Sequence, residues 1–143
     1  MASLNEVEAI FVTAFLAGLI AVWGVITQRI VARRNATLDY FSRMDNDRDL
    51  IDARKLFVHV TGEGFDLMSF TTPDKYDTNE AAAMRLTLNE NERLAIGIQF
   101  GILDREFVRR AVRGTIIRDW ELAAPWVYKI RSVTCNAAIY HEF

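Results

Sequence analysis

Residues 9–34 read AIFVTAFLAGLIAVWGVITQRIVARR, an apolar run that ends at three arginines. The first twenty of these residues, 9–28, carry no charge. As a helix they would rise about 30 Å, which matches the hydrocarbon core of a lipid bilayer. Trp23 lies near the arginine-bearing end, where an interfacial indole is expected. The run therefore predicts a transmembrane helix over residues 9–28.

Two other interpretations of the run are less favoured. A cleaved signal peptide needs a basic start and a small-residue cleavage site, whereas Glu6 and Glu8 are acidic and the run ends in arginines. A buried helix of a soluble core rarely needs apolar residues on every face over such a length. A single membrane-spanning helix is the better explanation.

The charges on the two sides of the run predict its orientation. Arg29, Arg33 and Arg34 follow the run, and Glu6 and Glu8 precede it. Because cytoplasmic flanks are enriched in Lys and Arg, we expect the N-terminus outside and the remaining chain in the cytoplasm. The predicted organisation is a short external N-terminus (1–8), a span of the inner, cytoplasmic membrane (9–28) and a cytoplasmic helical domain (29–143).

The span also carries small residues at four-residue spacing. Ala14 is paired in this way with Gly18, and Ala17 with Ala21. Such spacing lets two helices approach closely within a bilayer. Two explanations stay open: these four residues pack against a helix of another membrane subunit or of a second copy, or they reflect the general frequency of Ala and Gly in membrane helices. The first is slightly favoured. Trp23 and the three arginines are expected to contact lipid headgroups.

The charge balance beyond the run excludes some classes of partner. All 17 basic residues and 17 of the 19 acidic residues lie from position 29 onward, so the predicted cytoplasmic domain is formally neutral. A neutral domain gives no electrostatic reason to expect nucleic-acid binding. The single cysteine, Cys135, cannot form an intramolecular disulfide, which fits a reducing compartment.

The remaining chain has helical patterning throughout. Neither Gly nor Pro interrupts residues 25–61, so the first helix should continue several turns past the arginines. The polar stretch MDNDRD (44–49) supplies N-caps for a second helix that ends near Gly62. Residues 62–78 contain two further breakers and form the longest predicted loop. The sequence predicts an all-α protein.

Further along the chain, local signals predict four more helix starts. Asp77 or Thr78 caps a third helix, and Asn89 with Glu92 resembles a capping box that opens another. Asp104 begins a further helix, and Pro125 fits the first turn of a last helix that reaches Tyr140.

One uncharged segment predicts the centre of the core. Residues 94–103, LAIGIQFGIL, are too few to span a bilayer and suggest a buried central helix. Gly97 and Gly101 would let another helix pack against it. The aromatic residues Trp120, Trp126, Tyr128 and Tyr140 are expected to lie mostly in the core.

The Asp, His and Cys residues do not have the spacings that metal sites or catalytic sites require. Asp45, Asp47 and Asp49 mimic the start of a calcium loop, but its sixth and twelfth positions hold leucines. His59 has no second ligand at metal spacing, and Cys135 is interpreted as a small buried side chain. The best enzymatic alternative combines Glu92, His59 and an arginine. We expect no enzyme activity and no metal or cofactor.

A basic stripe is the remaining feature with chemical potential. Arg105, Arg109 and Arg113 share one helix face, with Arg110 beside them. Their functional interpretation is a patch that binds anionic lipid headgroups, a phosphate or an acidic partner. The more conservative interpretation is a solvated face balanced by neighbouring acids, among them Glu106 and Asp119.

The segments ARRNATLDYF (32–41), DARKLF (52–57) and LNENERLAIGIQFGILD (88–104) resemble those of one family. It is the domain of unknown function 4760 family, short single-pass bacterial proteins also met in phages and prophages. The resemblance implies a membrane helix followed by a helical domain, and it implies no activity.

Together these features predict a non-enzymatic, membrane-anchored interaction protein. It would be an accessory or assembly subunit of a larger membrane complex, or a homo-oligomer. The alternative, which the resemblance alone motivates, is a phage- or defence-linked membrane regulator that excludes or inhibits an envelope target.

Overall fold

The computed structural model describes residues 2–62 and 64–143. The side chains of residues 1–6, including Glu6 of the predicted external flank, lie outside the described part, as does residue 63. The elements are α1 (Ala2–Asn46), α2 (Arg48–Gly62), the 3-10 helix η1 (Leu67–Thr71), α3 (Asn79–Gln99) and α4 (Arg105–Thr134). The described residues contain no strand, so the predicted all-α fold is confirmed.

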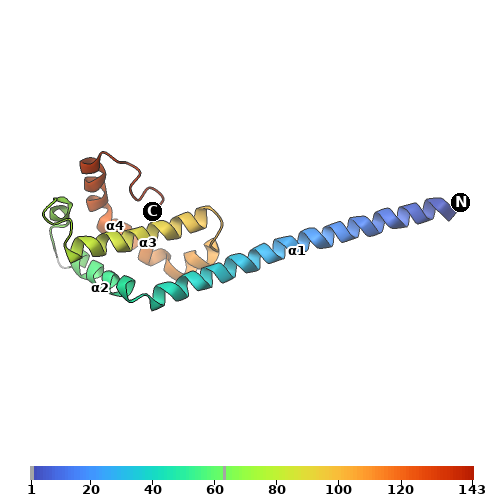
Figure 1. Ribbon diagram of the computed structural model, residues 1–143, viewed down its shortest axis with the longest axis horizontal. Helices are drawn as coiled ribbons and strands as arrows, with labels where there is room; N and C mark the ends of the chain where they lie inside the picture. Colours follow the sequence, from blue (N-terminus) through green and yellow to red (C-terminus); the bar gives the residue numbers. More distant parts are fainter. Residues whose placement is uncertain (1, 63) are drawn as a thin grey trace.

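Helix α1 has a projecting part and a packed part (Figure 1). Every side chain from Val7 to Asn35 is exposed, and Thr37 is the first buried residue after Val7. The helix passes through the arginines without a break and ends at Asn46, as expected from the absence of Gly and Pro. Asp47 then caps α2, because its Oδ1 accepts the N–H of Leu50 at 3.1 Å.

The packed region contains two apolar clusters. In the larger one, Phe57 of α2 and Met84 of α3 meet Trp126 of α4, and all three are fully buried. In the smaller one, Leu94 of α3 packs with Val108 of α4 and with Phe41 of α1. Helix α1 therefore joins the domain through the smaller cluster.

Helix α3 lies beside the packed part of α1 and runs antiparallel to it (Figure 1). The Tyr40 hydroxyl donates a hydrogen bond to Glu90 Oε1 at 2.7 Å. Closer to the projecting part, the Thr37 hydroxyl accepts the N–H of Asp104 at 2.7 Å. Burial, together with the hydrogen bond to the Glu90 carboxylate, raises the pKa of Tyr40 well above its usual value. These two bonds fix the register of α1 against the domain.

Asn89 does not begin a helix, so that prediction is wrong. It lies in the middle of α3, which starts where Thr78 Oγ1 accepts the N–H of Ala81 at 3.3 Å. An asparagine inside a helix costs only a few tenths of a kcal/mol more than most residues. The neighbouring helix formers therefore carry α3 through this position.

The uncharged segment 94–103 is not one buried helix. Leu94 and Leu103 are buried, but α3 ends at Gln99, and Phe100 and Ile102 are exposed. Gly97 does not receive another helix, because a Cβ there would lie 2.7 Å from Leu103 Cδ1. The segment instead turns the chain from α3 into α4.

Pro125 also departs from its predicted place, because it lies inside α4. Proline removes one backbone hydrogen bond and bends a helix, and α4 changes direction along its length in Figure 1. The helix ends at Thr134, so Tyr140 lies beyond it. Cys135, predicted to be buried, is exposed and closes the helix in a left-handed conformation with φ of 51°.

The segment after α4 folds back onto the core. Arg131 donates to the carbonyl of Ile139 at 2.8 Å and to that of Tyr140 at 3.0 Å. The Glu92 carboxylate accepts the N–H groups of Glu142 and Phe143, at 3.1 and 2.7 Å. Tyr140 is thereby buried against Trp126. Glu92 acts as a clamp on the C-terminal segment and not as part of a helix cap.

Two alanine variants in α3 distinguish these roles. Glu92→Ala should lower the free energy of unfolding by about 1 kcal/mol, because two backbone N–H groups lose a charged acceptor. It should also speed hydrogen exchange in residues 136–143. Asn89→Ala is the control and should be neutral or slightly stabilising. A loss of about 1 kcal/mol from Asn89→Ala would instead indicate a helix cap at this position.

Candidate functional site

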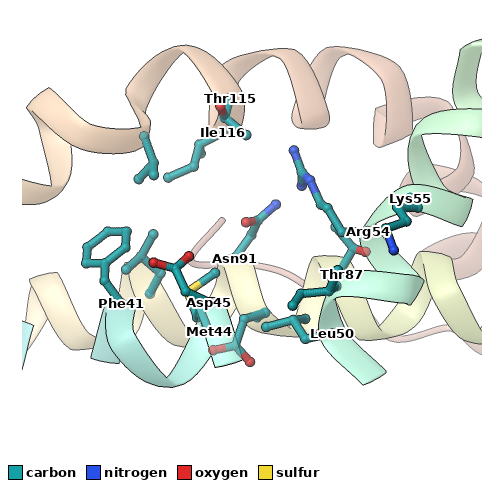
Figure 2. Close-up of a pocket in the computed structure, with 14 residues that line it drawn as sticks. Phe41, Met44, Asp45, Leu50, Arg54, Lys55, Thr87, Asn91, Thr115 and Ile116 are labelled. Atoms are coloured by element: carbon teal, nitrogen blue, oxygen red, sulfur yellow. The ribbon is translucent and has the colours of Figure 1, made fainter. Parts of the chain in front are cut away.

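A groove between α1, α2, α3 and α4 has a volume of about 310 Å³. Its walls are largely apolar and include Phe41, Leu50 and Ile116 (Figure 2). This size lies at the lower end of the range for small-molecule sites.

A buried polar network includes two residues that line the groove, Arg54 and Asn91. The Arg54 guanidinium of α2 forms two hydrogen bonds with the Asp119 carboxylate of α4, one of them from Nη2 to Oδ1 at 2.8 Å. Asn91 of α3 donates from Nδ2 to Asp119 Oδ2 at 3.2 Å. Asp119 is only 1% exposed. Figure 2 shows Arg54 and Asn91 both pointing toward α4. The network ties three helices together around one carboxylate.

Thr87 adds a polar atom to the same groove. Its hydroxyl is buried and has no hydrogen-bond partner among the described residues. Buried hydroxyls usually have a partner, because an unpaired one costs free energy. The groove therefore has largely apolar walls, and Arg54, Thr87 and Asn91 are among the polar residues that line it. This arrangement can accommodate an apolar group that carries a polar atom.

The sequence predicts Asp119 to be one of the solvated charges that balance the basic stripe. This prediction is wrong, because Asp119 is buried in the network. The signal was nevertheless present: Asp119 falls on the same helical stripe as Ile116 and Ala123, at spacings of three and four. Asn91 similarly falls between Leu88 and Leu94. A polar residue on an apolar stripe indicates a buried partner.

The residues predicted to pack within a membrane lie on the projecting part of α1. Ala14, Ala17, Gly18 and Ala21 are all exposed, and no described residue lies within 4 Å of a Cβ built at Gly18. Trp23 is exposed as well. No element of the described chain covers this part of the helix.

The three arginines after the run have partly different surroundings. Arg33 lies against the turn between α3 and α4, with Nη2 3.5 Å from the position of a Gly101 Cβ. Arg34 Nε lies 3.6 Å from Asp104 Oδ2. The backbone N–H of Phe107 is the main cause that lowers the pKa of Asp104, and Arg34 adds to it. Two of the predicted headgroup contacts therefore also hold α1 against the domain.

The basic stripe is exposed on α4 and partly neutralised within its own helix. Glu106 accepts hydrogen bonds from Arg109 at 2.8 Å and from Arg110 at 2.6 Å. These bonds lower the pKa of Glu106 to about 2. Arg105 and Arg113 are exposed on the same helix. The arrangement fits a solvated, internally paired surface.

The residues of the enzymatic alternative have separate partners. Glu92 holds the C-terminal segment, and Arg109 pairs with Glu106. His59 is exposed on α2, with its ring 5.4 Å from that of Phe65. Among residues 2–62 and 64–143, no group of three or more His, Cys, Asp or Glu side chains is arranged to hold a metal ion.

The fold and these sites show that the chain is an all-α protein with an extended apolar helix. In the described part of the chain, α1 is the one helix long and apolar enough to cross a membrane, and its most apolar stretch has a mean hydropathy of 2.5. Residues 11–143 match the family described as "Domain of unknown function (DUF4760)". The chain therefore belongs to the DUF4760 family, as its sequence resemblance indicated. No curated protein and no solved structure matches it.

A double-mutant cycle tests the buried network. The single changes Arg54→Met and Asp119→Leu should each lower the free energy of unfolding, the second by about 3 kcal/mol, because Arg54 then keeps a partly buried charge without its partner. The combined Arg54→Met and Asp119→Leu variant should lose less than the sum of the single changes. Glu106→Gln, on the exposed face of the same helix, is the control and should stay within about 0.5 kcal/mol of the parent. Additive losses would show that the two groups do not interact.

Proposed function

We propose that this protein is a non-enzymatic, membrane-anchored interaction protein. Helix α1 crosses the inner membrane once, with its N-terminus outside, and holds residues 29–143 at the cytoplasmic face. There the protein associates with another membrane subunit or with a second copy of itself.

The observation that carries the proposal is the uncovered apolar surface of α1. Phe11, Phe15 and Trp23 are each about 70% exposed, and the side chains between them are exposed as well. Each large apolar side chain that leaves water contributes about 1.5–3 kcal/mol. A soluble monomer with such a surface would aggregate. A bilayer removes the whole surface from water, and the helix has the length to cross it.

The polar groups in this part of α1 fit the same placement. The Thr13 hydroxyl donates to the carbonyl of Ala9 at 2.8 Å, so it needs no water. The family match begins at residue 11, inside the apolar run, and continues through the domain. Arg29, Arg33 and Arg34 at the domain end of the run support the inward orientation.

The same helix supplies the argument for association. Ala14, Ala17, Gly18 and Ala21 follow the spacing i, i+3, i+4 and i+7, so they form one narrow stripe of small side chains. Helices in bilayers associate through such stripes, because the backbones can approach closely. The partner surface is therefore a membrane helix, from a second copy or from another subunit.

A matched pair of substitutions tests this association. Gly18→Ile fills the stripe and should shift the protein, purified in mild detergent, from an associated species to the mass of one chain. Ala9→Ile also enlarges a small side chain, but it lies about 180° around the helix from Gly18 and should leave the associated mass intact. Native mass spectrometry gives the readout. A parent protein that is already a single chain without partners, or equal effects of both changes, would contradict the proposal.

A further inference from the structure

The turn between α3 and α4 is rigid. The N–H of Gly101 bonds to the carbonyl of Ile98 at 3.0 Å, and that of Ile102 to the carbonyl of Gly97 at 2.9 Å. This is the double hydrogen-bond pattern of a Schellman motif, and Gly101 has the positive φ, 67°, that the motif requires. The turn therefore presents its side chains in a fixed direction.

Two of those side chains are apolar and point away from the core. Phe100 is 74% exposed and Ile102 is 57% exposed. In most Schellman motifs the apolar residue after the glycine packs back onto the last turn of the helix. Here that place is occupied by Leu103, which lies over Gly97. Ile102 therefore does not pack onto the last turn of α3, and it stays 57% exposed where it borders α1.

The turn lies beside the first residues that follow the uncharged run of α1. From the contact of Tyr40 with Glu90, α3 continues antiparallel to α1 until Arg33 meets Gly101. A shallow concavity is lined there by Arg29, Arg33, Gly101 and Ile102, among others. In Figure 1 the turn is the end of the domain that faces the projecting part of α1.

The level of the turn along α1 matches the headgroup layer of a bilayer. Arg33 lies five residues after the end of the uncharged run, or about 7 Å along the helix axis. The headgroup and interfacial region of one leaflet is about 5–8 Å thick. If residues 9–28 fill the hydrocarbon core, Phe100 and Ile102 reach the interface of the same leaflet.

We propose that the α3–α4 turn is a second membrane contact, in which Phe100 and Ile102 insert into the leaflet from which α1 emerges. The contact rests on the membrane span proposed above and adds a fixed orientation of the domain to it. Arg29 and Arg33, which line the concavity beside the turn, bind lipid phosphates at the same level.

The space left beside the turn favours lipid over a protein as the partner that covers Phe100 and Ile102. With the turn at headgroup level, no layer is left between this end of the domain and the lipid for a folded partner. Exposed aromatic and aliphatic side chains next to arginines are also the composition of interfacial membrane contacts. The two attachment points, α1 and the turn, would stop the domain from tilting about the end of the span.

Fluorescence depth measurements test the contact with the full chain in lipid nanodiscs. A single environment-sensitive nitrobenzoxadiazole label is attached at Ile102→Cys, in a Cys135→Asn background that tolerates the left-handed conformation. Val133→Cys is the matched control, because Val133 is 56% exposed but lies near η1, beside Thr71 and Pro73. Val22→Cys reports on the span itself. Lipids that carry a nitroxide at the headgroup or deep in the chain act as quenchers.

The proposal predicts a blue-shifted label at position 102 that headgroup nitroxides quench, and an unshifted, unquenched label at position 133. Adding Phe100→Asp should reduce the quenching at position 102. A label at position 102 that behaves like that at position 133, while position 22 is quenched by deep nitroxides, would overturn the second contact and leave the span intact. Absence of quenching at position 22 would overturn both. A label at position 102 that is shielded from water in native membranes but not in nanodiscs would show that a protein covers the turn. This result would also overturn the proposal.

Discussion

The architecture depends on one constraint: twenty uncharged residues of α1 that no other part of the described chain covers. A helix in this position cannot contribute its apolar surface to the domain, so the domain must form its core from α2, α3, α4 and the C-terminal segment. The core residues Phe57, Met84 and Trp126 come from three different helices and meet without help from α1. Helix α1 enters only through its last turns, beside the smaller cluster.

The junction between α1 and the domain is built from specific bonds as well as apolar packing. The Thr37 hydroxyl accepts the N–H of Asp104 and donates to the carbonyl of Arg33, and the Tyr40 hydroxyl donates to Glu90. Because α1 is a continuous helix through this region, any orientation of its projecting part is passed directly to the domain. The buried Arg54–Asp119 pair adds a second constraint by joining α2 to α4. These bonds connect α1 rigidly to the domain, as the proposed membrane attachment requires.

The sequence predicted those parts of the fold that local signals control. The continuation of α1 past the arginines, a cap for α2 within residues 44–49, a cap for α3 at Asp77 or Thr78, and a helix start at Asp104 are confirmed. Each of these depends on residues within one or two turns. The helix starts predicted at Asn89 and Pro125 are wrong, because strong neighbouring helix formers outweigh one unfavourable residue. The groove and the Asp119 network could not be located, since they require the packing of helices distant in the sequence. The direction of Phe100 and Ile102 was also hidden, because it depends on Leu103 covering Gly97.

The central claim is that α1 spans the membrane and places the domain inside the cell. Thiol labelling of intact cells with a membrane-impermeant reagent tests it most directly, with Ser3→Cys and Ser132→Cys variants in the Cys135→Asn background. Ser132 is exposed on α4, so lack of access to it reports on the membrane and not on burial. The account predicts labelling of the Ser3→Cys variant in intact cells, and of the Ser132→Cys variant only after permeabilisation. Labelling of the Ser132→Cys variant in intact cells would contradict it.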